Sequence, residues 1–157
     1  MEIVFVCHGN YCRSPMAEFM MKHKLAQAGI TDVHVFSRAL HRDEIGSDMY
    51  GRAKQTLTAH GVPFTRHTAT LMSDDDFRKA DAVVVMDSYN YRDATRRFGK
   101  SDKIVPMMSA AGSSEDVDDP WYTRDFERTY REIDLALDAL VGKLARGERK
   151  VNALFGG

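Results

Sequence analysis

The sequence predicts an α/β fold: a four-stranded parallel sheet flanked by helices on both faces. Three observations lead to this prediction. Short apolar runs of strand length alternate with stretches of helical pattern along the chain. One run, residues 82–86 (AVVVM), is apolar throughout, which is typical of a parallel strand covered on both faces. Residues 123–146 repeat apolar side chains at helical spacing.

The first strand and the first helix are expected on either side of a short polar loop. Residues 2–6 (EIVFV) are mostly β-branched or aromatic and indicate a buried strand. Ser14 is expected to cap the following helix, with Pro15 at its first position, where a missing N–H costs nothing. Gly29 is expected to end this helix. The polar loop at residues 7–13 therefore joins the first strand to the N-terminus of the first helix, where parallel α/β sheets bind ligands.

The remaining elements continue the alternation. In chain order we expect a strand at residues 33–36, a helix at about 48–60, a strand at 82–86, a helix at 88–97, a strand at 103–107 and a helix at 123–146. Gly61 and Gly99 follow two of these helices, at positions where glycine commonly ends a helix. Residues 1–146 are expected to form a single domain, and residues 147–157 a loose C-terminal tail.

Composition and charge limit the class of partner. The formal net charge of the 157 residues is −1, which gives no reason to expect nucleic acid or an anionic membrane as a partner. No apolar run approaches the roughly 20 residues of a membrane-spanning helix. The two cysteines do not make a disulfide framework and favour a reducing compartment. We therefore expect a cytoplasmic protein that is a monomer or a weak homodimer.

The loop after the first strand carries the chemistry, with the sequence CHGNYCRS at residues 7–14. At a helix N-terminus, successive backbone N–H groups and the helix dipole hold an anion, and a cysteine there has a favoured thiolate. The planar fork of Arg13 can hold two phosphate oxygens. We expect Cys7 to be the nucleophile and Arg13 to bind the phosphate. Ser14, besides capping the helix, is expected to donate its hydroxyl to the Cys7 thiolate. The other loop residues expected to contact the substrate are His8, Gly9, Asn10, Tyr11, Cys12 and Ser14.

Residue spacing alone is weak evidence for this site. Cys and Arg six positions apart arise often by chance, and the plainer interpretation is a half-buried thiol and a surface arginine. The preceding strand, the Gly9-Asn10 turn and the Ser-Pro helix start are each needed for an anion-binding loop, and together they favour the functional interpretation. The other common phosphate loop, Gly-x-x-x-x-Gly-Lys-Ser/Thr, is absent from the sequence.

Transfer of a phosphoryl group to Cys7 also needs an acid that protonates the leaving oxygen. We expect Asp119, in the run Asp-Asp-Pro-Trp-Tyr, to fill this role, with Asp116 and Asp118 as rivals. Trp121 and Tyr122 are expected to line a pocket for an aromatic substrate. Taken alone, an Asp-Pro pair in an acidic segment is usually only a turn.

Together, these two segments resemble those of the low-molecular-weight protein tyrosine phosphatases, and the resemblance covers residues 1–146. The motifs that carry it are Val-Cys-x-Gly-Asn-x-Cys-Arg-Ser-Pro near the N-terminus and Asp-Pro-aromatic-aromatic late in the chain. The resemblance implies that Cys7 becomes phosphocysteine and that Arg13 binds the phosphate. It implies that Asp119 is the acid of the first step and the base of the second. It implies no metal and no cofactor.

The resemblance also implies supporting roles for residues around the loop. Asn10, Ser14, Ser37 and His67 are implied to form the polar network that holds the loop in shape. Cys12 is implied to form a reversible disulfide with Cys7 that protects the nucleophile from irreversible oxidation. Without the resemblance, His67 would be interpreted as a packed or surface histidine, and no histidine spacing in the sequence suggests a metal site.

The chain departs from the family pattern around the expected pocket. His8 and Tyr11 occupy two loop positions that are commonly aliphatic, Arg38 replaces an alanine, and Asp43 aligns with a common aromatic residue. We expect a phosphotyrosine-containing protein or peptide as the substrate, with Tyr11 supplying aromatic surface. The alternatives are a phosphoarginine phosphatase, a thiol-dependent arsenate reductase of the same fold and a phosphoprotein-binding module. The resembling reductases use further downstream cysteines, and this chain has none after Cys12.

Overall fold

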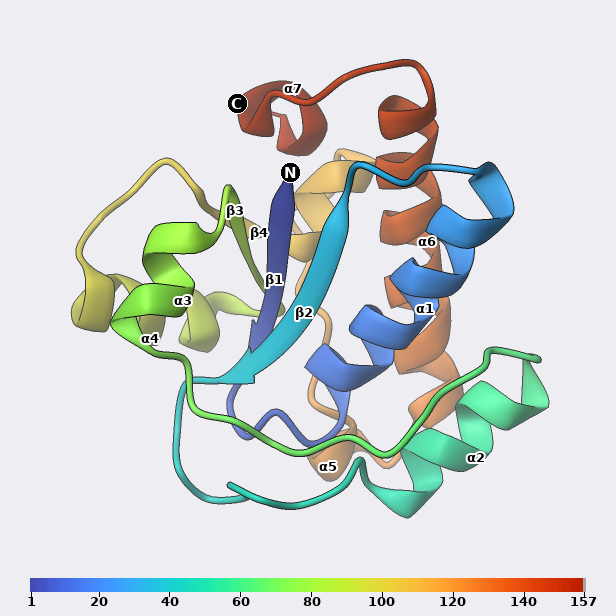
Figure 1. The fold of residues 1–157 in the computed structure, drawn as a ribbon. Helices are drawn as coiled ribbons and strands as arrows, with labels where there is room; N and C mark the ends of the chain where they lie inside the picture. The colour runs from blue at the N-terminus through green and yellow to red at the C-terminus, as the bar shows by residue number, and fades with distance from the viewer. Residues whose placement is uncertain (157) are drawn as a thin grey trace.

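Four parallel strands form one sheet in the computed structural model, which describes residues 1–156 (Figure 1). The strands are β1 (Glu2–Cys7), β2 (His34–Ala39), β3 (Ala82–Val85) and β4 (Ile104–Pro106). Their order across the sheet is β2-β1-β3-β4, so β1 lies in the interior between β2 and β3. The parallel sheet and its helices confirm the predicted fold class.

Helices cover both faces of this sheet. They are α1 (Arg13–Ala28), α2 (Gly51–Ala59), α3 (Asp74–Lys79), α4 (Ser88–Phe98), α5 (Pro120–Thr123), α6 (Phe126–Ala145) and α7 (Val151–Phe155), with a 3-10 turn η1 at Met107–Ala111. Ile3 and Phe5 of β1 pack in one apolar cluster with α1 and α6, whereas Val4 and Val6 pack in another with α3 and α4. Successive side chains of a strand point to opposite faces, so β1 must be apolar on both. Figure 1 shows α1 and α6 on one side of the sheet and α3 and α4 on the other.

The first helix starts differently from the prediction. α1 begins at Arg13, Cys12 occupies the N-cap position, and no side chain caps this end within residues 1–156. Ser14 is not the cap, because its hydroxyl contacts Cys7 Sγ and accepts a hydrogen bond from Asn10 instead. The backbone N–H groups at the start of α1 therefore have no side-chain cap, which leaves them available to an anion.

The second helix is shorter than predicted. α2 begins at Gly51, and Asp48 stays outside it. The Asp48 carboxylate accepts hydrogen bonds from the backbone N–H groups of Met49 and His67 and pairs with Lys54. Asp48 thus joins the start of α2 to the segment that carries His67, and this tertiary contact keeps it out of the helix.

Two short helices lie in segments for which the sequence predicted no element. In α3, Ser73 Oγ accepts from the Asp76 N–H and the Asp76 carboxylate accepts from the Ser73 N–H, so the two residues cap the helix reciprocally. In α5, Asp119 is the N-cap and Pro120 the first residue. The Asp-Pro pair that marked the candidate acid also starts this helix.

The prediction of a loose tail after residue 146 is wrong for residues 147–156. Leu154 and Phe155 of α7 are 0% and 2% exposed and join the same apolar cluster as α1 and α6. The Lys143 ammonium donates to the carbonyls of Leu154 and Ala110, and Arg149 pairs with Asp32. The apolar spacing of Val151, Leu154 and Phe155 marks one helical face, which explains why this segment packs instead of extending into solvent.

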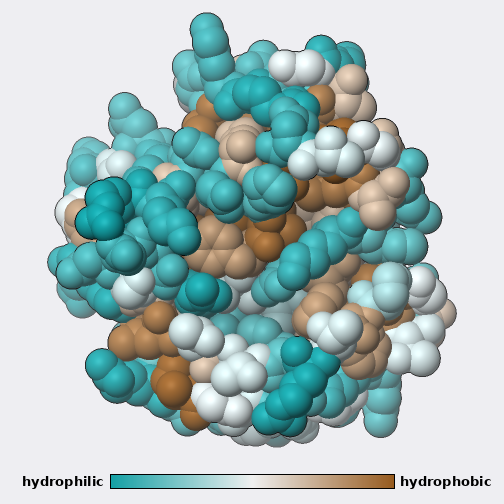
Figure 2. All heavy atoms as spheres, in the orientation of Figure 1, coloured by the Kyte–Doolittle hydropathy of each residue, from teal (hydrophilic) through white to brown (hydrophobic). Residues whose placement is uncertain are grey.

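The outer surface is largely polar on the face that Figure 2 displays. Hydrophilic residues cover most of it, and hydrophobic residues are visible mainly near its centre and at its lower left. Among the helices that residues 1–156 form, none is long and apolar enough to cross a membrane.

Candidate active site

Cys7 is the last residue of β1, and its thiol is nearly buried at 4% exposed. Its Sγ lies 3.0 Å from Ser14 Oγ. Asn10 Nδ2 donates to Ser14 Oγ at 2.8 Å, so the hydroxyl proton of Ser14 is free to point at the sulfur. Asn10 adopts the left-handed conformation (φ 55°), which asparagine tolerates better than most residues. This turn brings the loop around the sulfur.

A buried polar network holds the loop in this shape. Asn10 Nδ2 also donates to Ser37 Oγ at 3.0 Å, and Asn10 Oδ1 accepts from the Thr70 N–H at 3.0 Å. His67 Nε2 donates to the Asn10 carbonyl at 2.8 Å. Since buried polar groups stabilise a structure only when they are hydrogen-bonded, this network favours one conformation of the loop. The structure thus brings Asn10, Ser14, Ser37 and His67 together.

The side chains of Asn10 and Ser14, which were predicted to contact the substrate, do not line the cavity described below. Both are 0% exposed and bond to each other and to the elements that support the loop. Their role in this geometry is to hold Cys7 and the loop backbone in place. A polar side chain in a ligand-binding loop points either at the ligand or at the scaffold, and both were expected of these two residues from the sequence.

Arg13 lies beneath the loop and is held by charged and polar partners. Its side chain is 3% exposed, and its Nη1 donates to Asp87 Oδ2 at 2.6 Å and to the Val117 carbonyl at 2.8 Å. Burial opposes the charge of the guanidinium, but the neighbouring Cys7 and Asp87 outweigh it and raise the pKa of Arg13. Arg13 is therefore a fixed positive charge beside the Cys7 sulfur.

Asp119 approaches the same guanidinium from the far end of the chain. Its Oδ2 lies 3.5 Å from Arg13 Nη2, and its Oδ1 accepts from the Trp121 N–H at 3.0 Å. The side chain is 27% exposed, so it can exchange protons with solvent. The cap interaction with Trp121 orients one carboxylate oxygen and leaves the other directed toward Arg13.

The two rival carboxylates, Asp116 and Asp118, line the same cavity as Asp119 but do not pair with Arg13. Asp118 pairs with Arg128 on α6 at 2.9 Å. Asp116 borders the cavity, and burial together with the nearby charge of Asp87 raises its pKa. Neither forms an ion pair with Arg13, so the geometry within the described residues favours Asp119.

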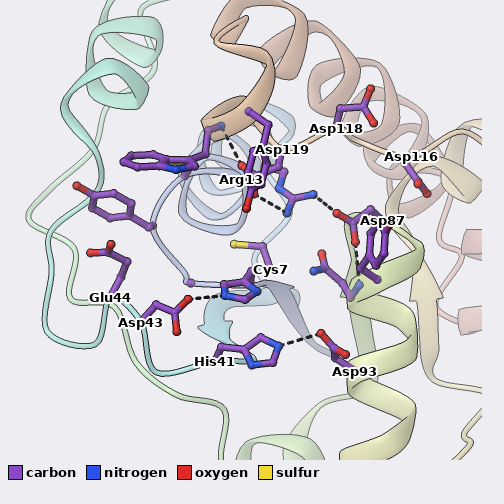
Figure 3. A pocket seen from close by; sticks show the side chains of 18 of the residues that line it. Cys7, Arg13, His41, Asp43, Glu44, Asp87, Asp93, Asp116, Asp118 and Asp119 are labelled. Atoms are coloured by element: carbon purple, nitrogen blue, oxygen red, sulfur yellow. Dashed lines mark hydrogen bonds and ion pairs between the residues drawn. The ribbon is translucent and has the colours of Figure 1, made fainter.

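These side chains open onto one cavity of about 850 Å³ (Figure 3). The predicted residues that line it are Cys7, His8, Gly9, Tyr11, Cys12, Arg13, Asp119, Trp121 and Tyr122. Figure 3 shows Cys7 between Arg13 and Asp119 on one side and His41 on the other. An anion that enters this cavity therefore meets the thiol, the guanidinium and a carboxylic acid together.

An aromatic wall borders the cavity. The Tyr11 ring lies 5.2 Å from Tyr50 and 6.4 Å from Trp121, and Tyr50 lies 5.5 Å from Trp121. Burial and the nearby Glu44 carboxylate raise the pKa of Tyr11, so it carries a neutral hydroxyl. Tyr122 is 82% exposed and stands at the rim.

Cys12 is the second cysteine of the loop and is 6% exposed. Both cysteines are free thiols in this structure. Burial and the neighbouring Cys7 raise the pKa of Cys12, so its thiol stays protonated. Cys12 is therefore a poor nucleophile, which separates its chemistry from that of Cys7.

Sequence reasoning missed several residues of the site. Asp87 holds Arg13 and also caps α4 by accepting from the Asn90 N–H at 2.8 Å. Glu18 of α1 accepts from Ser37 Oγ at 2.6 Å and extends the buried network. The position of Asp87 after an apolar strand and before a helix was the available signal, because such residues stand at the ligand edge of a parallel sheet. No equivalent signal marks Glu18.

Metal ligands do not gather within residues 1–156. No group of three or more histidine, cysteine or carboxylate side chains there has the geometry to hold a metal ion. The cavity instead offers a thiol, a fixed guanidinium and backbone N–H groups, a donor set that suits an oxyanion.

Comparison with known proteins assigns the family. The model of the low molecular weight phosphotyrosine protein phosphatase family matches residues 2–150. A low molecular weight protein-tyrosine-phosphatase PtpA from Staphylococcus saprophyticus is 34% identical over 143 residues, which cover 88% of this chain and 90% of that protein. The PtpA of Staphylococcus epidermidis is 30% identical and covers 92% of this chain and 94% of its own length.

Solved structures agree. YfkJ from Bacillus subtilis superposes with a TM-score of 0.88 at 26% identity and covers 95% of this chain and 97% of its own. SP-PTP, a low molecular weight protein tyrosine phosphatase from Streptococcus pyogenes, superposes with a TM-score of 0.81 at 29% identity, covering 91% and 92%. This chain therefore belongs to the low molecular weight phosphotyrosine protein phosphatase family.

Proposed function

We propose that this protein hydrolyses phosphotyrosine in proteins or peptides through a phosphocysteine intermediate on Cys7. One observation carries the proposal: Cys7, Arg13 and Asp119, from two ends of the chain, line the same cavity. The 3.0 Å contact between Cys7 Sγ and Ser14 Oγ supports the sulfur as nucleophile, because the hydroxyl is placed to donate to a thiolate.

In the first step, the Cys7 thiolate attacks the phosphorus and the bond from phosphorus to the ester oxygen breaks. Asp119 gives its proton to the leaving phenolate oxygen, so tyrosine departs as a neutral phenol. Arg13 and the loop N–H groups bind the equatorial phosphoryl oxygens, where charge is stabilised in the transition state. The fixed orientation of Arg13 by Asp87 supports this role, since it needs no reorganisation during the reaction.

In the second step, Asp119 takes a proton from a water molecule that attacks the phosphocysteine. The bond from sulfur to phosphorus breaks, inorganic phosphate leaves and the thiolate returns. The same carboxyl group serves both steps because its proton, lost in the first, is regained in the second. The oxygen of Asp119 directed toward Arg13 supports this assignment over Asp116 and Asp118.

The substrate is proposed from the walls of the cavity. Tyr11 and Trp121 offer an aromatic surface beside the nucleophile, which suits the ring of phosphotyrosine better than the short chain of phosphoserine. His8, Gly9, Tyr11, Cys12, Trp121 and Tyr122 are the proposed substrate-contacting residues. We propose a cytoplasmic location as well, supported by the two free thiols, and a monomer or weak homodimer.

A panel of phosphopeptides tests the proposal. Peptides of matched sequence that carry phosphotyrosine, phosphoserine or phosphoarginine are incubated with the wild type and with Cys7→Ser, and released phosphate is measured without added metal. Phosphotyrosine should be cleaved fastest, and Cys7→Ser should be inactive. Turnover by Cys7→Ser would refute the phosphocysteine intermediate. Faster cleavage of phosphoarginine would change the proposed substrate from phosphotyrosine to phosphoarginine. Tight binding without phosphate release would indicate a binding module.

A further inference from the structure

Two histidines from different loops form a stacked pair at the cavity, next to the nucleophile. The rings of His8 and His41 have centroids 4.2 Å apart and an interplanar angle of 25°. His8 follows Cys7 directly, and His41 follows the end of β2. Both side chains line the cavity and are about half exposed, at 48% and 41%.

A carboxylate that also lines the cavity holds each ring of this histidine pair. His8 Nε2 donates to Asp43 at 2.6 Å, and His41 Nε2 donates to Asp93 on α4 at 2.8 Å (Figure 3). Because an ionised carboxylate only accepts, both imidazoles have their Nε2 proton directed at these carboxylates. The rings are thus fixed in orientation at one edge while their faces stack.

The backbone makes the same connection. The His41 N–H donates to the His8 carbonyl at 2.9 Å, and the Leu40 N–H donates to the Cys7 carbonyl at 3.0 Å. The loop after β2 therefore continues the pairing of β1 with β2 past the nucleophile. Because this hydrogen bond joins the two backbones, a movement of His41 would also displace His8, and the two residues form one side of the cavity.

We propose that the histidine pair sets the selectivity of the cavity for an aromatic leaving group, and that Asp93 is a positioning residue that holds the pair through His41. This inference rests on the proposed function. The substrate ring packs between the imidazole faces and the aromatic wall of Tyr11 and Trp121, both of which line the same cavity. Contact between flat aromatic rings contributes more binding free energy than the buried area alone, whereas a short alkyl phosphate has no ring that could stack.

The charges around the pair favour this role over phosphate binding. Asp43 and Asp93 accept the Nε2 protons, so these donors are not available to a phosphate oxygen. Arg13, the phosphate ligand, lies on the other side of Cys7 from His41 (Figure 3). Loss of the pair should therefore weaken binding of the ring and leave binding of phosphate intact.

The test measures binding by calorimetry with two probes, benzylphosphonate and inorganic phosphate. His41→Leu should weaken benzylphosphonate about threefold to tenfold, the range of one aromatic contact, and change phosphate affinity less than about twofold. Because no turnover is involved, this result stands even if the enzyme proves not to hydrolyse phosphotyrosine. In turnover assays with a phosphotyrosine peptide, the same variant should raise KM and leave kcat within about twofold.

Further variants separate positioning from mere structure. His41→Phe retains the stacked ring and should keep most of the benzylphosphonate affinity. The double variant His8→Leu/His41→Leu should bind benzylphosphonate no more weakly than the weaker-binding of the two single variants, because the rings act as a unit. Asp93→Ala should raise KM, and Asp93→Asn, whose amide oxygen still accepts from His41, should restore it. His60→Leu is the matched control, since His60 also stacks on a ring (Tyr130) and pairs with a carboxylate (Glu127) but lies outside the cavity.

Two results would overturn the inference. In the first, His41→Leu and Asp93→Ala leave benzylphosphonate affinity equal to that of His60→Leu. In the second, they weaken benzylphosphonate and inorganic phosphate by the same factor, which means that the histidine pair only supports the phosphate loop.

Discussion

Arg13 illustrates how single residues make this site. Its guanidinium is nearly excluded from solvent, yet its pKa is raised because Cys7, Asp87 and Asp119 surround it. A buried charge with this many partners costs free energy if any partner is removed, so its position is strictly determined. The same partners leave its planar fork oriented for two phosphate oxygens, a geometry that an ammonium group does not offer.

Arg13→Lys should lower kcat toward a phosphotyrosine peptide by about 10²- to 10³-fold, the usual cost of losing one oriented transition-state donor. Steady-state kinetics with wild type and variant measure this. Arg96→Lys, an exposed change on α4, is the control and should retain full activity. An Arg13→Lys enzyme within about threefold of wild type would show that a point charge suffices there.

Asp119→Asn should lower kcat by about 10²- to 10⁴-fold for phenyl phosphate, whose leaving group needs a proton, and much less for p-nitrophenyl phosphate, whose leaving group does not. The comparison of the two substrates isolates the acid role from binding. Asp118→Asn should affect both substrates only slightly, because Asp118 pairs with Arg128. A larger loss of kcat for phenyl phosphate in Asp118→Asn than in Asp119→Asn would identify Asp118 as the acid.

At the scale of elements, loops that follow β1 and β2 are locked together by polar side chains. Asn10 connects the phosphate loop to Ser37 on β2 and to the Thr70 backbone, and Asp48 connects the start of α2 to the His67 backbone. These bonds cross loops, which regular secondary structure does not stabilise. The shape of the site therefore depends on a few side chains between elements.

Asp48→Asn should reduce stability near neutral pH by at most about 1 kcal/mol, the range of partly exposed ion pairs. The hydrogen bonds from Lys54 and from the His67 N–H lower the pKa of Asp48 to about 2. Since this pKa lies below the unfolded value of about 3.9, the stabilisation is present above about pH 4 and is lost as the pH falls toward 2.

Urea denaturation of wild type and Asp48→Asn at several pH values measures this dependence. The difference in free energy of unfolding should be constant from pH 7 to about pH 5 and shrink below pH 4. Asp102→Asn, in an exposed turn before β4, serves as the control and should show no such pattern. A difference between wild type and Asp48→Asn that persists unchanged to pH 2 would contradict the linkage.

At the scale of the whole molecule, the C-terminal segment closes the end of the core opposite the phosphate loop, near the N-terminus (Figure 1). Phe155 and Leu154 fill that end, and Arg149 pairs with Asp32 in the loop before β2. The segment is thus part of the folded domain and lies away from the catalytic cavity. Its loss should affect stability and not chemistry.

Phe155→Ala should destabilise the protein by about 3–5 kcal/mol, the usual cost of removing a buried phenylalanine ring. Urea denaturation measures the change. The kcat for an aryl phosphate, measured without urea, should stay near the wild-type value. Asn152→Ala, on the exposed side of α7, is the control. Equal stability of the two variants would mean that residues 151–155 form a loose tail after all.

The sequence predicted the sheet and most helix positions because local pattern encodes them. The apolar run of β3 marks a strand buried on both faces, and Gly29 and Gly99 end α1 and α4 where expected. It missed α3, α5 and α7, since helices of four to six residues span less than two turns and leave little periodic signal. For Ser14, the expected contact with the Cys7 sulfur is present, whereas the expected helix cap is not, because the hydroxyl is engaged at the sulfur.

By itself, the sequence determined the parallel α/β fold and the order Cys7, Arg13, Asp119, because a nucleophile, a phosphate ligand and an acid are encoded in short motifs. Only the tertiary structure decided which further groups surround them: Asp87 at Arg13, Glu18 at Ser37, and His41 against His8. These contacts join residues that lie 74, 19 and 33 positions apart. The physical reason is that spacing along the chain specifies local conformation, whereas contacts between remote segments follow from the strand order and the packing of helices on the sheet.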